Sequence, residues 1–337
     1  GSRNTALGYG ALGLLNYDGD GYNTAVGYEA GAAMTTGVFN TILGDIAGDA
    51  LTTGAANVAI GYQALSLEDT HGHNVAIGFQ SLANQNAGAN AYNVAIGSNA
   101  GLSVTTGVEN TLIGGLAGDA LTTGTYNVAI GYAALSTEDG HGKNVAIGYR
   151  SLTSQDAGSN AYNVAIGFDS GRLISTGGQN TIIGGLAGDA LTSGDNNTAL
   201  GYSTLGAETL GDRNVAIGNF ALQVQNNTSN ADVYNTAVGF SAGASMTTGI
   251  QNTLIGGLAG DALTTGSYNI ALGYSALSSE DANGRNVAIG YFALYSQNAG
   301  VDAYNIAIGH SAGQAITTGI EDVVIGGLAG SSLTTGG

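Results

Sequence analysis

The sequence predicts an all-β fold, a parallel β-solenoid (β-roll) of 19 short coils. Three observations lead to this prediction. The pattern Asn-x-Ala-Ile-Gly recurs with a period of 17 residues. Glycine makes up 59 of 337 residues and proline is absent, while the β-branched residues Val, Ile and Thr fill the motif. Because a 17-residue period is too short for a pair of helices, it indicates coils made of short strands and turns.

The motif organises the whole chain. Most copies follow one another at 17 residues, every fourth spacing is 19, and one is 21. Four coils therefore make a 70-residue super-repeat, which is lengthened once to 72 by an insert at Asn226–Asp232. The copies begin at Asn4, Asn23, Asn40, Asn57, Asn74, Asn93, Asn110, Asn127, Asn144, Asn163, Asn180, Asn197, Asn214, Asn235, Asn252, Asn269, Asn286, Asn305 and Asp322.

These boundaries predict a single β-solenoid domain over residues 4–337. Its super-repeats are 23–92, 93–162, 163–234, 235–304 and the partial 305–337, and residues 1–3 are expected to be a cloning or fragment edge. Each coil is expected to hold one strand on Asn-x-Ala-Ile-Gly-Tyr and a second, shorter extended segment near x-Ala-Leu, joined by turns such as Thr-Thr-Gly. At a strand spacing of about 4.8 Å, the coils would stack into a rod on the order of 90 Å long.

Three motif positions are expected to build the coil. The fourth residue is Ile, Val or Leu in every copy and is the candidate for the inward core stripe. The fifth is always Gly, which suits a positive φ or a close backbone approach. The first, Asn, is expected to stack into a hydrogen-bonded ladder. In three consecutive coils these structural residues are Asn57, Ile60, Gly61, Asn74, Ile77, Gly78, Asn93, Ile96 and Gly97.

Both faces of the predicted strand are apolar. Val58 and Ile60 share one side and Ala59 and Gly61 share the other, because alternate residues of a strand point in opposite directions. A 17-residue coil has only one interior. We therefore expect the Ala and Gly side to meet another subunit in a parallel homo-oligomer about a shared axis.

The composition argues against several function classes. The formal net charge is −18 and the chain has only six Lys and Arg residues, so no basic stripe is available for nucleic acid. No apolar run approaches the roughly 18–20 residues that span a bilayer, so membrane insertion is not expected. The absence of cysteine excludes disulfides and thiolate chemistry.

One type of turn contains candidate metal ligands. Carboxylate and imidazole groups lie close together at Glu68, Asp69 and His71, and again at Glu138, Asp139 and His141. The equivalent turns, Ala207-Glu208-Thr209-Leu210 and Glu280-Asp281-Ala282-Asn283, have no His, and copies four coils apart would be about 19 Å from one another. We therefore predict a solvated acidic turn and no bound metal or cofactor, with these six residues as the candidates if a cation binds.

No pattern of catalytic residues is recognisable. The chain has no Cys, four scattered His and no Gly-x-Ser-x-Gly elbow, and Gly-Gly-Leu-Ala-Gly lacks the Lys of a phosphate-binding loop. Paired carboxylates on a solenoid face could cleave glycans, but the acidic residues here fall on turns. The sequence favours a non-enzymatic protein.

The motif resembles known repeats. Asn-x-Ala-Ile-Gly-x-x-Ser/Ala resembles the head repeat of trimeric autotransporter adhesins, although coils of that family are nearer 14 residues. The unit Asn-Thr-Ala-Val-Gly-Tyr at Asn23, which ends in Thr-Thr-Gly, is similar to repeats of phage tail fibres and bacterial surface fibres found upstream of endosialidase-type intramolecular chaperones. The similarity covers Asn4 to Gly337 and implies a left-handed β-roll in a homotrimer.

The resemblance implies a function as well. We expect a structural fibre or stalk segment of an extracellular appendage or phage tail fibre, located outside the cell, on its surface or on a virion. The alternative is an adhesin or receptor-binding module that recognises a cell-surface glycan or protein through its variable turns.

Overall fold

The computed structural model describes residues 2–229 and 231–335. Gly1, part of the expected fragment edge, lies outside these residues. Over the described residues the chain forms 19 parallel strands of three residues each and no helix. The predicted all-β parallel β-solenoid with a 17-residue period is therefore confirmed.

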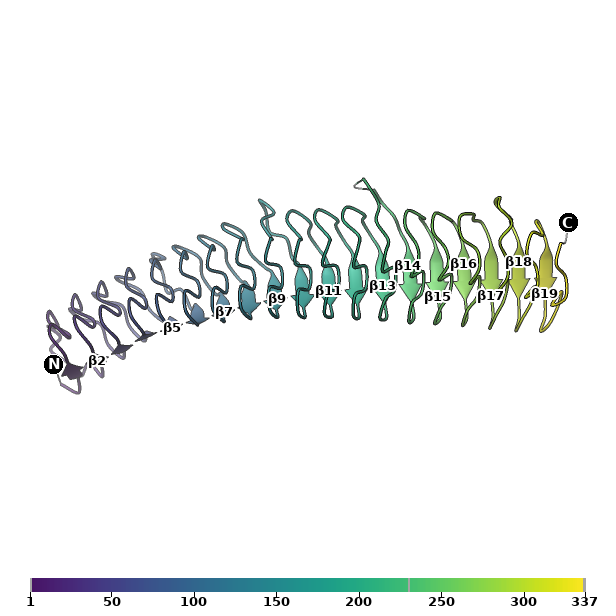
Figure 1. The fold of residues 1–337 in the computed structure, drawn as a ribbon. Coiled ribbons are helices and arrows are strands. Elements are labelled where there is room, and N and C mark those ends of the chain that lie inside the picture. The colour runs from purple at the N-terminus through teal and green to yellow at the C-terminus, as the bar shows by residue number, and fades with distance from the viewer. Residues whose placement is uncertain (1, 230, 336–337) are drawn as a thin grey trace. The chain divides into compact units, whose positions relative to one another are not determined.

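The chain divides into two compact units, Gly1–Val164 and Ala165–Gly337, and we describe each by itself. Strand β10 (Val164–Ile166) contains the division. The strands of the N-terminal unit are β1 (Thr5–Leu7), β2 (Thr24–Val26), β3 (Thr41–Leu43), β4 (Val58–Ile60), β5 (Val75–Ile77), β6 (Val94–Ile96), β7 (Thr111–Ile113), β8 (Val128–Ile130) and β9 (Val145–Ile147) (Figure 1). Those of the C-terminal unit are β11 (Thr181–Ile183), β12 (Thr198–Leu200), β13 (Val215–Ile217), β14 (Thr236–Val238), β15 (Thr253–Ile255), β16 (Ile270–Leu272), β17 (Val287–Ile289), β18 (Ile306–Ile308) and β19 (Val323–Ile325).

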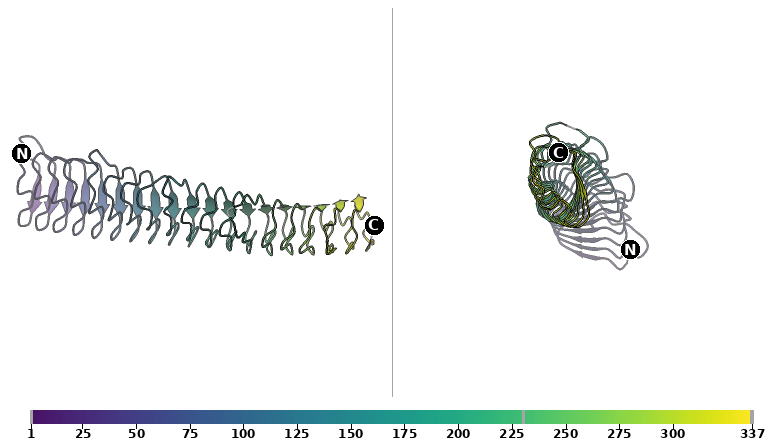
Figure 2. Two further views of the ribbon diagram at one scale, coloured as in Figure 1. Left: turned by 90° about the horizontal axis from the view of Figure 1, so that it is seen from above. Right: turned by 90° about the vertical axis from the view of Figure 1, so that its right-hand side faces the viewer.

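Within each unit the strands pair in parallel and in register. In β4 and β5, Ala59 lies opposite Ala76 and Ile60 opposite Ile77, and in the C-terminal unit Ala288 of β17 lies opposite Ala307 of β18. Identical motif positions therefore stack directly on one another. The end-on view in Figure 2 shows the coils of the C-terminal unit, from teal to yellow, as successive loops of similar outline.

The second extended segment predicted near x-Ala-Leu is wrong for the described residues, because that part of each coil forms turns. In the coil that begins at Asn57, Gln63 and Leu65 have φ of 54° and 53°, in the left-handed region. Residues in this region bend the chain instead of extending it. The turn returns the chain to the start of the next strand, so each coil contributes a single strand.

The predicted direction of the strand faces is also wrong. Ile60, Ile77 and Ile96 point outward and are half-buried, whereas the third residue of the motif is buried in every strand except the terminal β1 and β19, as Ala59, Ala76 and Ala95 show. The physical reason is space: a 17-residue coil is narrow, and its interior also holds large side chains from the turns, such as Leu65 and Leu82. The small side chain therefore faces inward although the larger one is more hydrophobic.

Every fourth coil has a large residue at the inward third position, and glycine makes room for it. Leu112 is fully buried. A Cβ added at Gly101 would lie 2.7 Å from Leu112 Cδ1, and one added at Gly118 would lie 2.8 Å from its Cδ2. In the C-terminal unit Leu254 takes the same place. Once in each super-repeat of four coils, a large core side chain is therefore accommodated by glycines in its own coil and in the preceding one.

The predicted asparagine ladder is present. The backbone N–H of Asn110 donates to Oδ1 of Asn93 at 2.8 Å, and Asn110 Nδ2 donates to the carbonyl oxygen of Gly124 at 2.9 Å. Asn127 in turn donates its N–H to Asn110 Oδ1. These Asn side chains are buried. Each of these Asn residues links its strand to the previous coil through its backbone N–H. Its side-chain Nδ2 links the strand to the turn that leads into the next coil.

The invariant glycine has the predicted positive φ, and its close neighbour is the next coil of the same chain. Gly97 has a φ of +140°, and a Cβ added there would lie 2.5 Å from the carbonyl oxygen of Gly114. Real Cβ atoms do not approach an oxygen so closely, and this φ is accessible almost only to glycine. Glycine is therefore required at this position for two independent reasons.

We expect Gly97→Ala to destabilise the chain by more than about 3 kcal/mol, since it adds a backbone clash to an unfavourable φ. Gly88→Ala is the matched control: Gly88 also has a positive φ, +70°, but nothing lies within 4 Å of its added Cβ. It should cost only about 1–2 kcal/mol. Chemical denaturation followed by circular dichroism measures both, and equal losses would contradict the close-approach argument.

We expect Asn110→Ala to cost about 1–3 kcal/mol more than Asn144→Ala. Both side chains accept a hydrogen bond from the next Asn in the ladder. Only Asn110 also donates through Nδ2, because Nδ2 of Asn144 has no partner in residues 2–229 and 231–335. The comparison is made by denaturant titration of the two variants. A greater loss for Asn144→Ala would show that the side-chain donor contributes nothing.

Candidate functional site

The outer face of the sheet is the first candidate site. It consists of the second and fourth motif residues, such as Val94 and Ile96 in the N-terminal unit and Val287 and Ile289 in the C-terminal unit, all half-buried. None of the described strands has a charged residue at either position. In each unit the face is therefore a series of Val, Ile, Leu and Thr side chains that the single chain leaves partly exposed.

Aromatic residues border this face directly after the invariant glycine. In the N-terminal unit Tyr62 stacks on Phe79 with ring centroids 5.5 Å apart, and Tyr132 stacks on Tyr149 at 5.7 Å. Tyr132 is 51% exposed and Tyr149 42%. These rings were not among the residues predicted to form a site, although Tyr or Phe recurs at the sixth motif position in the sequence.

A second border lies at the residue before each Asn. Several copies combine aromatic and positively charged side chains there: Lys143 Nζ lies 5.1 Å from the ring centroid of Tyr162, and the Arg285 guanidinium lies 5.2 Å from that of Tyr268 and 5.5 Å from that of Tyr304. The exposed Glu109 and Glu321 occupy the same position in other copies. Such contacts hold the cation over the ring face. Charge is thus found at the edges of the outer face and not on its strands.

The second candidate site is the turn with Glu, Asp and His. The prediction of a solvated acidic turn is wrong for its glutamates, since Glu68 and Glu138 have no exposed surface, whereas Asp139 is exposed and Asp69 half-buried. Glu138 occupies the twelfth position of its coil, where the preceding coil has the core residue Leu121. The backbone of this position points the side chain inward whatever its chemistry.

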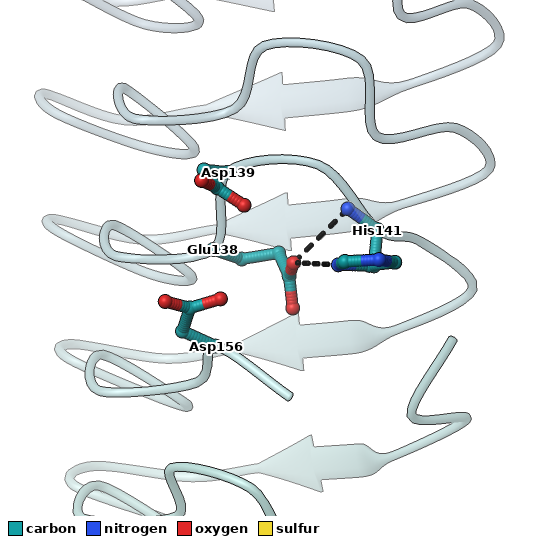
Figure 3. A group of neighbouring side chains, drawn as sticks. All are labelled: Glu138, Asp139, His141 and Asp156. Atoms are coloured by element: carbon teal, nitrogen blue, oxygen red, sulfur yellow. Dashed lines mark hydrogen bonds and ion pairs between the residues drawn. The ribbon is translucent and has the colours of Figure 1, made fainter. Parts of the chain in front are cut away.

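The side chains around Glu138 form a compact group. Glu138 Oε1 accepts the backbone N–H of His141 at 3.1 Å and lies 3.5 Å from His141 Nδ1. Asp139 and Asp156 complete the group, and one ligand atom from each of the four residues lies within 4.8 Å of the others (Figure 3). Glu138 Oε2 has no hydrogen-bond partner among the described residues. Burial raises the pKa of Glu138, and the His141 N–H opposes this in part.

The first copy of this turn is similar but lacks one acid. Glu68, Asp69 and His71 also have ligand atoms within 4.8 Å of one another, and Glu68 Oε1 accepts the His71 N–H at 3.1 Å. Asn86 occupies the position of Asp156. The structure thus brings together each set of three residues selected as metal candidates, and it adds Asp156 to the second set.

The other two copies differ in how the glutamate is paired. Glu208 accepts the N–H of Gly211 at 2.8 Å and side-chain N–H groups of Gln225 at 2.9 Å and Asn227 at 3.1 Å, so both carboxylate oxygens are paired. Glu280 accepts the N–H of Asn283 at 3.3 Å, and its Oε2 has no partner within the described part of the chain. The buried glutamate is therefore a feature of all four copies, and the His belongs to two.

Comparison with protein-family models, with curated proteins and with solved structures found no match to this chain. In residues 2–229 and 231–335 there is no helix with the length and apolar character needed to cross a bilayer. Function is therefore argued from the two sites themselves.

We expect Glu280→Gln to stabilise the chain by about 1–2 kcal/mol at pH 7, because it replaces a buried carboxylate with a neutral amide. Burial raises the pKa of Glu280 above its ordinary value. The stability that this group contributes is therefore present when it is protonated and is lost as the pH rises through the raised pKa. The advantage of the variant should disappear near pH 4, where the wild-type carboxyl is protonated.

The control is Glu208→Gln. Because both oxygens of Glu208 accept hydrogen bonds, an amide there would place a donor against donors, and this variant should be less stable than the wild type at pH 7. Thermal midpoints between pH 4 and pH 8 give both comparisons. A destabilising Glu280→Gln at pH 7 would contradict the expected cost of the buried charge.

Proposed function

We propose that this chain is a non-enzymatic structural segment of an extracellular or virion fibre, which associates with copies of itself through the outer sheet face. The observation that carries the proposal is the partly exposed, uncharged face of Val, Ile, Leu and Thr in every coil, bordered by exposed aromatic rings. Contiguous apolar surface of this kind marks a protein contact. The sequence resemblance supports a homotrimer as the assembly.

A second copy of the same chain is the occupant that fits this face best. The strands of each unit repeat their Val and Ile side chains in register, one coil after another. A parallel copy has the same repeat, so side chains that pack against one another in one coil would pack in the same register in the next coil. Closed symmetry about a shared axis would cover the face on every copy.

The charge distribution agrees with this assembly. The formal net charge is −18, and like-charged chains repel one another unless the contact surface is uncharged. Here the strands contribute no charge to the face, and cations such as Lys143 and Arg285 lie at its border on aromatic rings. Association through this face would bury aliphatic and aromatic groups while the acidic turns stay in solvent.

Sedimentation velocity on the full chain tests the proposal. We expect the wild type to sediment as an oligomer, with three times the chain mass of 33.2 kDa for the trimer. The double variant Ile77→Glu, Ile130→Glu should dissociate it, because each charge would enter the uncharged face; both residues are half-buried and outward in the single chain. Circular dichroism verifies that the coil is retained.

Ser159→Glu is the matched control. Ser159 lies exposed in a turn, so the added charge should leave the assembly unchanged. A wild-type chain that sediments as a stable monomer would refute the proposal. So would an oligomer that resists the double variant but dissociates on Ser159→Glu, because its contact would then lie in the turns.

A further inference from the structure

We propose that Glu138, Asp139, His141 and Asp156 form a binding site for a divalent transition-metal cation, and that Glu68, Asp69 and His71 form a weaker site of the same kind. These groups differ from the residues of the outer sheet face, so the inference is independent of the proposed assembly.

The first argument is geometric. One ligand atom from each of the four residues lies within 4.8 Å of the others. Ligands on opposite sides of a cation bound at about 2.0–2.6 Å are about 4–5 Å apart, so the four groups already lie within coordination range. Figure 3 shows the carboxylate of Glu138 between Asp139 and Asp156 on one side and His141 on the other.

The second argument is an unpaired buried oxygen. Glu138 has no exposed surface, and its Oε2 has no hydrogen-bond partner in the described ranges, although its carboxylate is part of this group of possible ligands. His141 Nδ1 is likewise buried without a hydrogen bond. Leaving such atoms unpaired is costly, and a cation would satisfy both with the ligand types that metals prefer.

The equivalent glutamates of the other copies differ in how their second carboxylate oxygen is paired. At the equivalent Glu208, the coil has no His, and the protein itself pairs the second carboxylate oxygen through Gln225 and Asn227. Where His141 is present, the corresponding oxygen has no hydrogen-bond donor among the described residues, and the carboxylate lies among other possible metal ligands. At Glu280, which has no His, Oε2 also lacks a partner in the described ranges, so the unpaired oxygen indicates a site only where the other ligands surround the carboxylate, as they do at Glu138.

The ligand set indicates the class of cation. Imidazole suits Zn²⁺ and related transition metals, whereas Ca²⁺ and Mg²⁺ prefer oxygen ligands alone. A mixture of one imidazole with carboxylates therefore favours Zn²⁺ or Mn²⁺. The exposed Asp139 and Asp156 are free to adjust to the shorter bonds of these ions, while Glu138 is fixed by its burial and by the His141 N–H.

Isothermal titration of the full chain, after treatment with EDTA, tests the site with ZnCl₂, MnCl₂ and CaCl₂ as separate probes. We expect two Zn²⁺ sites per chain. His141→Asn should abolish the tighter and His71→Asn the weaker. Both substitutions introduce the residue that the fourth copy has naturally at Asn283, so the coil should still fold.

Two further variants test the individual ligands. Asp156→Asn should weaken the tighter site by about tenfold or more, toward the affinity of the first copy, which has Asn86 there. The pair Asn283→His, Asn298→Asp would give the fourth copy all four ligands and should add a third site. The imidazole resonances of His71 and His141 in a ¹⁵N spectrum should shift on saturation with Zn²⁺.

Three results would overturn the inference. The first is the absence of Zn²⁺ and Mn²⁺ binding below 1 mM, about the weakest affinity of dedicated sites. The second is a Zn²⁺ stoichiometry that neither His141→Asn nor His71→Asn changes. The third is Ca²⁺ binding tighter than Zn²⁺, which would exclude His as a ligand. A third site in the Asn283→His, Asn298→Asp variant would support the inference even if a loss-of-function variant failed to fold.

Discussion

The close contact between successive glycines is the constraint on which the rest of the structure depends. A Cβ added at Gly61 would lie 2.3 Å from the carbonyl oxygen of Gly78, and the same kind of contact recurs within each unit, for example from Gly97 to Gly114 and from Gly256 to Gly273. Because each coil meets the next at the same backbone position, the coils superimpose without a shift in register. The asparagine ladder, the stacked rings and the outer rows of Val and Ile all follow from this alignment.

The narrow interior explains why the core residues change from coil to coil within the four-coil super-repeat and why the core contains glutamate. Coils with glycine at the ninth position have a large apolar residue at the twelfth, as in Gly118 and Leu121. From the coil at Asn57 onward, coils with leucine at the ninth position have Glu or Gln at the twelfth, as in Leu135 and Glu138. Both positions point inward, so volume is shared between them along the stack. The buried carboxylate is a consequence of this arrangement.

Much of the architecture could be predicted from the sequence because it depends on period and on backbone conformation. The spacing of Asn57 and Asn74 predicted the parallel stack, and the invariance of Gly61 predicted its positive φ. The direction of Ile60 could not be predicted in the same way. Alternation shows which residues share a face but not which face is inside, and here the width of the coil outweighed hydrophobicity.

The candidate metal ligands illustrate the same limit. Glu138 and His141 are close in sequence, so their proximity could be predicted, whereas Asp156 comes from the next coil and was not selected. The burial of Glu138 could be predicted only by comparing the twelfth residues of neighbouring coils, such as Leu121. The charged residues of this single turn suggested that Glu138 is exposed to solvent. The residues at the same position in neighbouring coils, such as Leu121, indicate instead that it lies in the core.

The distribution of side chains separates folding from association. The interior of the coils contains Ala, large apolar residues such as Leu65 and Leu121, and buried Asn, Gln and Glu, while most Val and Ile side chains at the second and fourth motif positions and the aromatic side chains lie outside. A single chain therefore holds its coils together through hydrogen-bond ladders and close backbone packing together with the burial of core side chains such as Leu65 and Leu121. The outward Val, Ile and aromatic side chains stay partly exposed, so they have surface left to bury in a contact between chains. Changes at Asn110 or Gly97 should then act on the coil, and changes at Ile77 or Ile130 on assembly.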